Sequence, residues 1–176
     1  MGQSSTFYEI KETDFNKIKD EPSLFNISET ESLETLEQNA FGIEFILKKM
    51  LDSKHHEIVE ELFYPKVYLG KKPDYGNMDF DQVILDEFED NSIGFLTPNQ
   101  ILLMDNLLRS ITANGLEKSY NSSELNSNRI YPEVWHDNEL NDQAFNKTHI
   151  AEGIEQLKSI LDRAKRNGNY IFVFSG

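Results

Sequence analysis

The chain has 176 residues, of which 38% are hydrophobic and 27% charged, and its formal net charge is −14. This composition is typical of a folded globular protein and unlike a disordered chain, so we treat residues 1–176 as a single domain. The negative charge repels nucleic-acid phosphates and anionic lipid headgroups, so we expect neither nucleic acid nor a membrane as partner.

The absence of certain residues and motifs also excludes several kinds of site and of cellular location. The sequence contains no cysteine, which excludes disulfides, thiolate zinc sites and cysteine nucleophiles. Residues 1–15 lack the basic region and apolar core of a signal peptide, and no apolar run approaches the roughly 18 residues of a membrane span. We therefore expect a cytoplasmic protein.

The negative charge is distributed unevenly along the chain. Residues 1–63 carry 6 Lys and Arg against 14 Asp and Glu, a net charge of −8, whereas residues 126–176 carry 6 against 7, a net charge of −1. An acidic N-terminal segment of this kind can complement a basic protein partner, because opposed potentials speed encounter and select partners. The same charge can also serve solubility alone.

The first third of the chain predicts a strand followed by helices. Residues 6–11 alternate in polarity as a strand does, and Thr13 is placed to cap a short helix after it. Ser28 and Glu31 have the spacing of a capping box. We predict a long helix over residues 31–51, because apolar residues recur there at helical spacing and share one face: Leu33, Leu36, Ala40, Ile43, Leu47 and Met50.

The next segments are less regular. Ser53 can cap a further helix, which Pro65 ends. Residues 66–96 are irregular, and the stretch "FDQVILDEF" within them fits either a strand or a short helix.

A clear helix signal follows at residues 98–113. Thr97 and Gln100 have capping-box spacing, and Pro98 occupies the first helical position, where its missing N–H costs nothing. The pair Asn114-Gly115 is a typical helix end. Residues 119–129 are rich in serine and asparagine and predict a loop.

The C-terminal part predicts a helix and a strand. An apolar stripe indicates a helix over residues 150–167, with Gly168 at its end. Five consecutive large apolar residues within 169–175 suit a strand buried on both faces. The predicted fold is therefore α+β: a single compact domain with three main helices packed on a small sheet that includes the N- and C-terminal strands.

The most unusual stretch is "NRIYPEVWHDN", residues 128–138, which holds the only tryptophan. Pro132 biases Tyr131 towards an extended conformation, so this pair suits a rigid turn that packs an aromatic ring in the core. Tyrosine and tryptophan also suit pocket walls, since each is apolar with one hydrogen-bonding group. Because a polar run follows, we expect Trp135, His136 and Asp137 to be more exposed, and we name them with Tyr131 as candidate binding residues.

Motifs for catalysis, cofactors and metals are missing. The sequence has no G-x-S-x-G, no P-loop and no G-x-G-x-x-G. His56 and Glu60 supply two metal ligands without a third, and the calcium-loop spacing that begins at Asp137 fails because Asp142 stands where glycine is needed. We predict no metal, no cofactor and no catalytic residue, which favours a non-catalytic protein and leaves an enzyme as the alternative.

Three segments occur in an order that resembles a known family: "FLTPNQILLMDNL", "NRIYPEVW" and "LKSILDRAKRNGNYIFVFSG". With "MGQSSTFYEIKETDF" at the start, they are similar to the YfbM-like proteins, a bacterial family of unknown function. The resemblance covers nearly the whole chain and implies a compact single α+β domain. It implies no established reaction and no catalytic residues.

The chain departs from this family in the predicted long helix. Relatives often carry an aromatic residue and a histidine around the positions of Ala40 and Glu44, so a role of that histidine does not transfer. Gly42 is costly inside a helix and indicates that a backbone or a ring comes close, so we predict an aromatic side chain over it, from the C-terminal strand or the Tyr131 segment. We expect Glu44 to be exposed or half-exposed; if buried with a partner, it becomes a candidate binding residue.

Two functions from different classes remain. The first is a non-catalytic protein-binding domain with an acidic surface, for example an immunity-type inhibitor of a basic protein. The second is an enzyme or small-ligand binder with a pocket near Trp135. A flat acidic surface favours the first, whereas a deep pocket with convergent polar groups favours the second.

Overall fold

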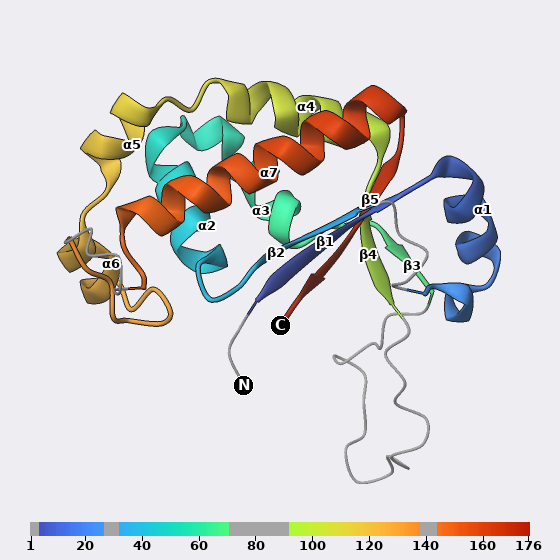
Figure 1. Cartoon of the computed structure of the whole chain (residues 1–176), viewed down its shortest axis with the longest axis horizontal. Coiled ribbons are helices and arrows are strands. Elements are labelled where there is room, and N and C mark those ends of the chain that lie inside the picture. Colours follow the sequence, from blue (N-terminus) through green and yellow to red (C-terminus); the bar gives the residue numbers. More distant parts are fainter. Residues whose placement is uncertain (1–3, 27–31, 71–91, 138–143) are drawn as a thin grey trace, which may run out of the picture.

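The computed structural model describes residues 4–26, 32–70, 92–137 and 144–176. These residues form an α+β fold with seven α-helices and a five-stranded antiparallel sheet (Figure 1). The predicted class is confirmed, but the expectation of three main helices is wrong, because shorter helices connect the long ones. None of the helices in the described ranges combines the length and apolar character needed to cross a membrane.

The sheet places strands from both ends of the chain at its centre. Its order is β2-β1-β5-β4-β3, and every pairing is antiparallel. The predicted strands at 6–11 and 169–175 are confirmed as β1 and β5, which pair along their whole length. The strands are β1 Ser5–Ile10, β2 Ser32–Leu36, β3 Tyr68–Leu69, β4 Ile93–Leu96 and β5 Tyr170–Ser175.

Helices cover the two faces of this sheet unequally. One face carries Phe7, Ile171 and Leu96 and packs in the main hydrophobic core beneath α2, α3, α4 and α7 (Figure 1). The opposite face carries Phe95 and Phe172 and packs against α1 in a smaller core. The helices are α1 Glu12–Asp20, α2 Ala40–Met50, α3 His56–Phe63, α4 Pro98–Arg109, α5 Ala113–Ser119, α6 Ser122–Ser127 and α7 Lys147–Asn167, with short 3-10 helices at Pro22–Leu24 and Ser53–His55.

Burial of β5 follows the extent of this cover. Its residues Ile171, Phe172 and Val173 are buried, as predicted for a central strand. Phe174 is 38% exposed, so burial on both faces holds only for the first part of the strand. The sheet face around Phe174 and Leu33 is left partly open, because α1 covers only the other end of that face.

The predicted helix over 31–51 is wrong in its first half. Residues Ser32–Leu36 form strand β2, and the helix begins only at Ala40. Leu33 pairs opposite Tyr8 on β1, and Leu36 faces the main core on the other side of the strand. Pairing with β1 therefore overrides the helical apolar spacing of this segment. The predicted capping box at Ser28 and Glu31 lies outside the described residues.

Several predicted boundaries were also wrong. The helix that starts at Pro98 ends at Arg109, and Asn114-Gly115 lies inside α5, which Thr112 caps. Residues 119–129 are not a loop throughout, because Asn121 caps the short helix α6. Lys11, rather than Thr13, stands at the N-cap of α1. The stretch "FDQVILDEF" lies outside the described residues.

The helix termini with strong capping residues are predicted well. The capping box of α4 is present, with the Gln100 amide donating to Thr97 Oγ1 at 3.4 Å and the Thr97 amide to Gln100 Oε1 at 2.9 Å. Gly168 ends α7 with φ of 67°, a left-handed conformation that glycine adopts without strain.

We expect Thr97→Ala to lower the free energy of unfolding by about 0.5–2 kcal/mol, because it removes the side-chain acceptor at the N-terminus of α4. Urea unfolding measures the loss. Asn99→Ala, an exposed change in the same helical turn, is the matched control and should stay within about 0.5 kcal/mol of the unsubstituted protein. Equal effects of the two substitutions would contradict a capping role.

Candidate functional site

Trp135 is a core residue, contrary to the expectation that it is exposed. Its side chain is only 2% exposed and belongs to the main hydrophobic core. The indole Nε1 donates to the carbonyl of Ile130 at 2.8 Å, and the ring meets Phe145 edge to face at 5.9 Å between centroids. The indole lies over Gly42 of α2, so the predicted aromatic cover of this glycine is confirmed. The indole N–H is therefore hydrogen-bonded inside the protein. The polar residues that follow Trp135 in the sequence gave no indication of this burial.

The backbone on either side of Trp135 is held by neighbouring helices. Asn126 of α6 accepts from the Trp135 amide at 2.9 Å and donates to its carbonyl at 3.0 Å. Tyr120 donates its hydroxyl to the His136 carbonyl at 2.6 Å, and burial together with the charge on Asp137 raises the pKa of that phenol. These bonds tie the segment to α6 and to the residue that ends α5.

The other named candidates in this segment are more accessible. Tyr131 is half-buried with its ring edge-on to Phe41, and the His136 amide donates to the Phe145 carbonyl at 2.9 Å. Asp137 is exposed and accepts from the Ser122 amide at 3.1 Å, and hydrogen bonding to Ser122 lowers the pKa of its carboxyl. Trp135, His136 and Asp137 line neither of the two hollows on α7 described below.

Glu44 is half-buried, as expected, and takes part in an ion pair. Its side chain is 14% exposed and accepts from Lys48 Nζ at 2.7 Å, and the same ammonium donates to Glu60 at 2.7 Å. Burial lowers the pKa of Lys48, but the bonds to the two glutamates outweigh it and the net pKa is raised. His56 Nε2 lies 2.7 Å from the Lys48 carbonyl oxygen. Within the described residues no three His, Asp or Glu side chains are grouped to hold a metal ion.

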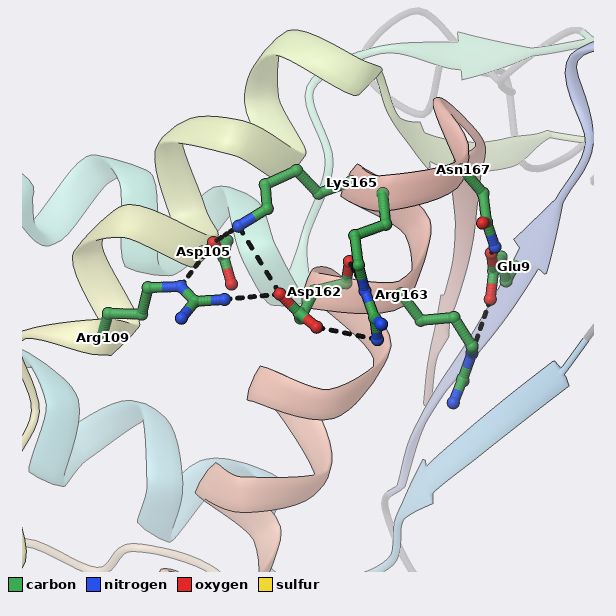
Figure 2. Close-up of polar contacts among 8 residues, drawn as sticks. Glu9, Asp105, Arg109, Asp162, Arg163, Lys165 and Asn167 are labelled. Carbon is green, nitrogen blue, oxygen red and sulfur yellow. Dashed lines mark hydrogen bonds and ion pairs between the residues drawn. The ribbon is translucent and has the colours of Figure 1, made fainter.

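Two fully buried carboxylates anchor α7 to the rest of the fold (Figure 2). Glu9 on β1 accepts from Arg163 Nε at 2.7 Å, from Asn167 Nδ2 at 3.0 Å and from Asn169 Nδ2 at 2.8 Å. Figure 2 shows Glu9 between the strand and the last turns of α7. The carboxylate therefore joins β1, α7 and the start of β5 at one point.

Asp105 performs the same role between α4 and α7. This carboxylate is 1% exposed, accepts from Arg109 Nε at 2.8 Å and is also bonded by Lys165 (Figure 2). Burial raises the pKa of Asp105, but the bonds and charges of Arg109 and Lys165 outweigh it and leave the pKa below its ordinary value. Asp162 extends the network, within reach of Arg109, Lys165 and Arg166. Each carboxylate in this network has cationic partners, which suits a structural role.

A polar recess elsewhere on α7 carries carboxylates with no Lys or Arg among its described lining residues. It is a hollow of about 190 Å³ between the turn that joins β2 to α2 and the first half of α7. The side chains at its exposed rim include two carboxylates, Glu37 from the turn and Glu152 from α7. No Lys or Arg is among the described residues that line it: Thr35, Leu36, Glu37, Asn39, His149, Glu152, Gly153 and Gln156. We refer to these eight residues as the acidic recess.

Two residues of the acidic recess hold buried polar atoms without a hydrogen-bond partner among the described residues, Asn39 Oδ1 and His149 Nδ1. Asn39 is the N-cap residue of α2, yet its side chain makes no capping bond. The other two asparagines at N-caps do, since Asn121 accepts from the Glu124 amide at 2.8 Å and Asn146 from the His149 amide at 3.2 Å. A buried acceptor left without a donor costs about 1–3 kcal/mol. Both atoms have essentially no accessible surface, so they lie behind the surface of the hollow.

A second hollow, of about 320 Å³, lies on the other side of α7, where α5 begins. Its floor is apolar and includes Ile111, Leu116 and Ile154. Its rim carries ion pairs, such as Lys158 with Glu155 at 2.7 Å. Glu152 lines both this hollow and the acidic recess.

Comparison with known proteins gives a family and a fold. A family model described as a domain of unknown function, DUF1877, matches residues 1–174. The chain belongs to the DUF1877 family. The crystal structure of YfbM from Escherichia coli, a protein of unknown function, has a similar fold, with a TM-score of 0.65 and 19% identity over 98% of this chain and 99% of that chain. No curated protein matches the sequence. The YfbM-like resemblance is thus confirmed, and at this identity the likeness to YfbM concerns the fold alone.

The polar sites of this DUF1877-family chain were missed from the sequence for identifiable reasons. Asp105 lies four residues after Ile101 and three before Leu108, so its place on an apolar helical stripe was a usable signal. Glu9 gave none, because a single acidic residue in an alternating strand normally faces solvent. Asn39 could not be recognised, since the predicted long helix ran through its turn.

Gly42→Ala tests the contact with Trp135. An added Cβ would lie 2.2 Å from Trp135 Cη2 and 2.5 Å from Cζ2. We expect a loss of about 1–3 kcal/mol in the free energy of unfolding, despite the better helix propensity of alanine. In a Trp135→Phe background, which lacks both ring atoms, the same substitution should cost less.

The control for this cycle is Gly115→Ala in α5. Its added Cβ would meet the far end of the Met50 side chain at 2.8 Å, and this flexible group can move aside. Thermal and urea unfolding of all four proteins and the control give the comparison. An unchanged or raised melting temperature for Gly42→Ala would show that nothing rigid lies over this glycine.

Asp105→Asn tests the buried ion pairs of α7 through their pH dependence. The pKa of Asp105 is lower in the folded protein than in the unfolded chain, where it is near 4, so the ionised carboxylate stabilises the fold above about pH 4. This stabilisation is lost as the pH falls through the folded pKa. We expect the variant to lose about 1–3 kcal/mol at pH 7, and the difference should shrink below about pH 4. Asp14→Asn, which removes an exposed ion pair with Lys17, should cost less than about 1 kcal/mol. A loss that stays constant from pH 7 to pH 3 would contradict the assignment.

Proposed function

We propose that this DUF1877-family protein is a non-catalytic protein-binding domain that holds a basic protein at the acidic recess. The observation that carries the proposal is the recess itself, in which the exposed carboxylates of Glu37 and Glu152 occur without a lining cation. A cationic side chain supplies both the charge and the donors that this surface lacks. An immunity-type inhibitor, which blocks a basic protein by binding it, is one form of such a domain.

The position of the acidic residues refines the idea of an acidic surface. The acidic residues within residues 1–63 separate in the fold, because α1 lies at one end of the sheet and α2 and α3 lie under α4 and α7 (Figure 1). Several of them, including Asp14, Glu44 and Glu57, already pair with lysines. The net charge of residues 1–63 therefore attracts a basic partner over a distance, while the recess offers local contacts.

Polar groups elsewhere in the described residues favour binding over catalysis. The buried carboxylates Glu9 and Asp105 are occupied by cations and amides from their own chain. His56 bonds a backbone carbonyl of α2. None of these groups lines either of the two hollows on α7, where a nucleophile or a second titrating group could join it for acid–base catalysis.

Small-molecule binding is the second candidate, and the hollow between α5 and α7 favours it. Its volume of about 320 Å³ and its apolar floor resemble the smaller ligand pockets of proteins. This pocket lies beside the first turns of α7 and is not lined by Trp135. A small ligand at this hollow is therefore a candidate beside the expected pocket near Trp135.

Affinity capture from the native cell tests the proposed function. We expect the immobilised protein to retain a basic protein in stoichiometric amount at low salt and to release it at high salt, because the contact is electrostatic. Glu37→Gln/Glu152→Gln removes two charges from the recess while keeping side-chain shape, and it should abolish capture.

The matched control for capture removes the same charge elsewhere. Glu12→Gln/Asp20→Asn changes two exposed residues of α1, at the other end of the molecule, and should retain the partner (Figure 1). Equal loss in both double variants would show that only net charge matters and would overturn the role of the recess. If no basic protein is retained at low salt, the binding function is wrong and the small-molecule candidate stands.

A further inference from the structure

The hollow between α5 and α7 has the size and the lining of a site for a small molecule. Its volume of about 320 Å³ lies at the lower end of the roughly 300–1,000 Å³ of ligand pockets. Its floor consists of buried core side chains, Ile111 and Leu116 on the α5 side and Ile154 on α7. Thr112 and Ala113, which also line it, are exposed. An apolar body can therefore reach the floor from solvent without displacing the core.

The lysines that line this hollow are already paired with acceptors of their own chain. Lys147 of α7 donates to Glu117 of α5 at 2.5 Å, and Lys158 donates to Glu155 at 2.7 Å. Lys158 also donates to the Ile111 carbonyl at 3.2 Å. A ligand with a negative charge would have to compete with these acceptors for the ammonium groups, so the lysines do not favour an anion.

The third carboxylate of the lining, Glu152, is exposed and is the one that stays unpaired. It has no ion-pair partner among the described residues. Two lysines against three glutamates leave the lining with a net charge of −1. The acidic recess on the other side of Glu152 adds the carboxylate of Glu37 and no described Lys or Arg. The charge that complements this end of the hollow is therefore positive.

We infer that this hollow binds a small monoamine with an apolar body, and that Glu152 pairs with its ammonium group. The inference rests on the small-molecule candidate of the proposed function and names the class of its ligand. An ammonium carries three donors on one atom, so it can bond Glu152 while the apolar body lies on Ile154 and Leu116. A neutral molecule would leave Glu152 unpaired, and a carboxylate would bring a like charge beside it.

The test titrates the full chain with three probes that share one apolar body and follows the binding by two-dimensional ¹⁵N NMR. The amine is 2-phenylethylamine, the neutral counterpart is 2-phenylethanol and the anion is 3-phenylpropanoate. We expect the amine at millimolar concentrations to shift the amides of Leu116, Ala151 and Ile154. The alcohol should bind at least about threefold more weakly, because it forms no ion pair with Glu152, and the anion should bind more weakly still.

Three variants assign the binding to this hollow. Glu152→Gln removes the charge while keeping the side-chain shape, so it should lower the amine affinity at least about threefold and leave the affinity for 2-phenylethanol unchanged. Glu12→Gln makes the same change at an exposed residue of α1 and should leave both affinities unchanged. Ala113→Leu adds volume at an exposed lining residue and should abolish the shifts with all three probes, while the rest of the spectrum shows an unchanged fold.

The possible outcomes separate this inference from the proposed function. Equal or tighter binding of 2-phenylethanol or 3-phenylpropanoate would overturn the amine and retain a small-molecule site. Equal loss of amine affinity in Glu152→Gln and Glu12→Gln would overturn the pairing with Glu152. If no probe gives localised shifts, the inference and the small-molecule candidate are both wrong. Capture of a basic protein at the acidic recess does not depend on this titration, so the protein-binding function can stand or fail separately.

Discussion

The burial of one carboxylate determines how the two layers of this molecule fit together. Glu9 is fully buried on the central part of the sheet, and an isolated charge there would be strongly unfavourable. Arg163 and Asn167 of α7 and Asn169 at the start of β5 supply its partners. The position of the longest helix on the sheet is thus constrained by hydrogen-bond geometry as well as by packing. Asp105 imposes a similar constraint between α4 and α7, so the helix is fixed from two sides.

The parts of the fold that were predictable from the sequence are those with local signals. The capping box at Thr97, the glycine end at Gly168 and the apolar stripe of α7 each depend on residues within a few turns of one another, and the structure contains all three. The close contact at Gly42 was also foreseeable, because a glycine in a helix interior needs a reason. The segment Ser32–Leu36 was not, since its strand conformation depends on pairing with β1, far away in the sequence.

The difference between local signals and long-range contacts also explains which site residues were predicted wrongly. The exposure of Trp135 was inferred from the polar residues after it, whereas its burial depends on Gly42 and Ile150, which come from two distant helices. The acidic recess depends on a turn and a helix separated by more than a hundred residues, so no local pattern could indicate it. Family membership does not supply the missing information, because the family model and the YfbM structure both describe proteins of unknown function. In the described residues, Glu9 and Asp105 have donors from their own chain, whereas Asn39 Oδ1 and His149 Nδ1 have no hydrogen-bond partner.

The order of strands has a consequence for how the protein is made. The strands β1 and β5 lie side by side at the centre of the sheet, and the serine pair that joins their ends, Ser5 and Ser175, is separated by 170 residues. During translation β1 emerges early and can pair only with β2 on one side. The other edge of β1 stays unpaired, and the apolar sheet face that α7 covers stays open, until α7 and β5 have also left the ribosome. Such long-range pairing slows folding and leaves an aggregation-prone edge exposed in the meantime, so the high negative charge of the first third of the chain also keeps nascent molecules apart.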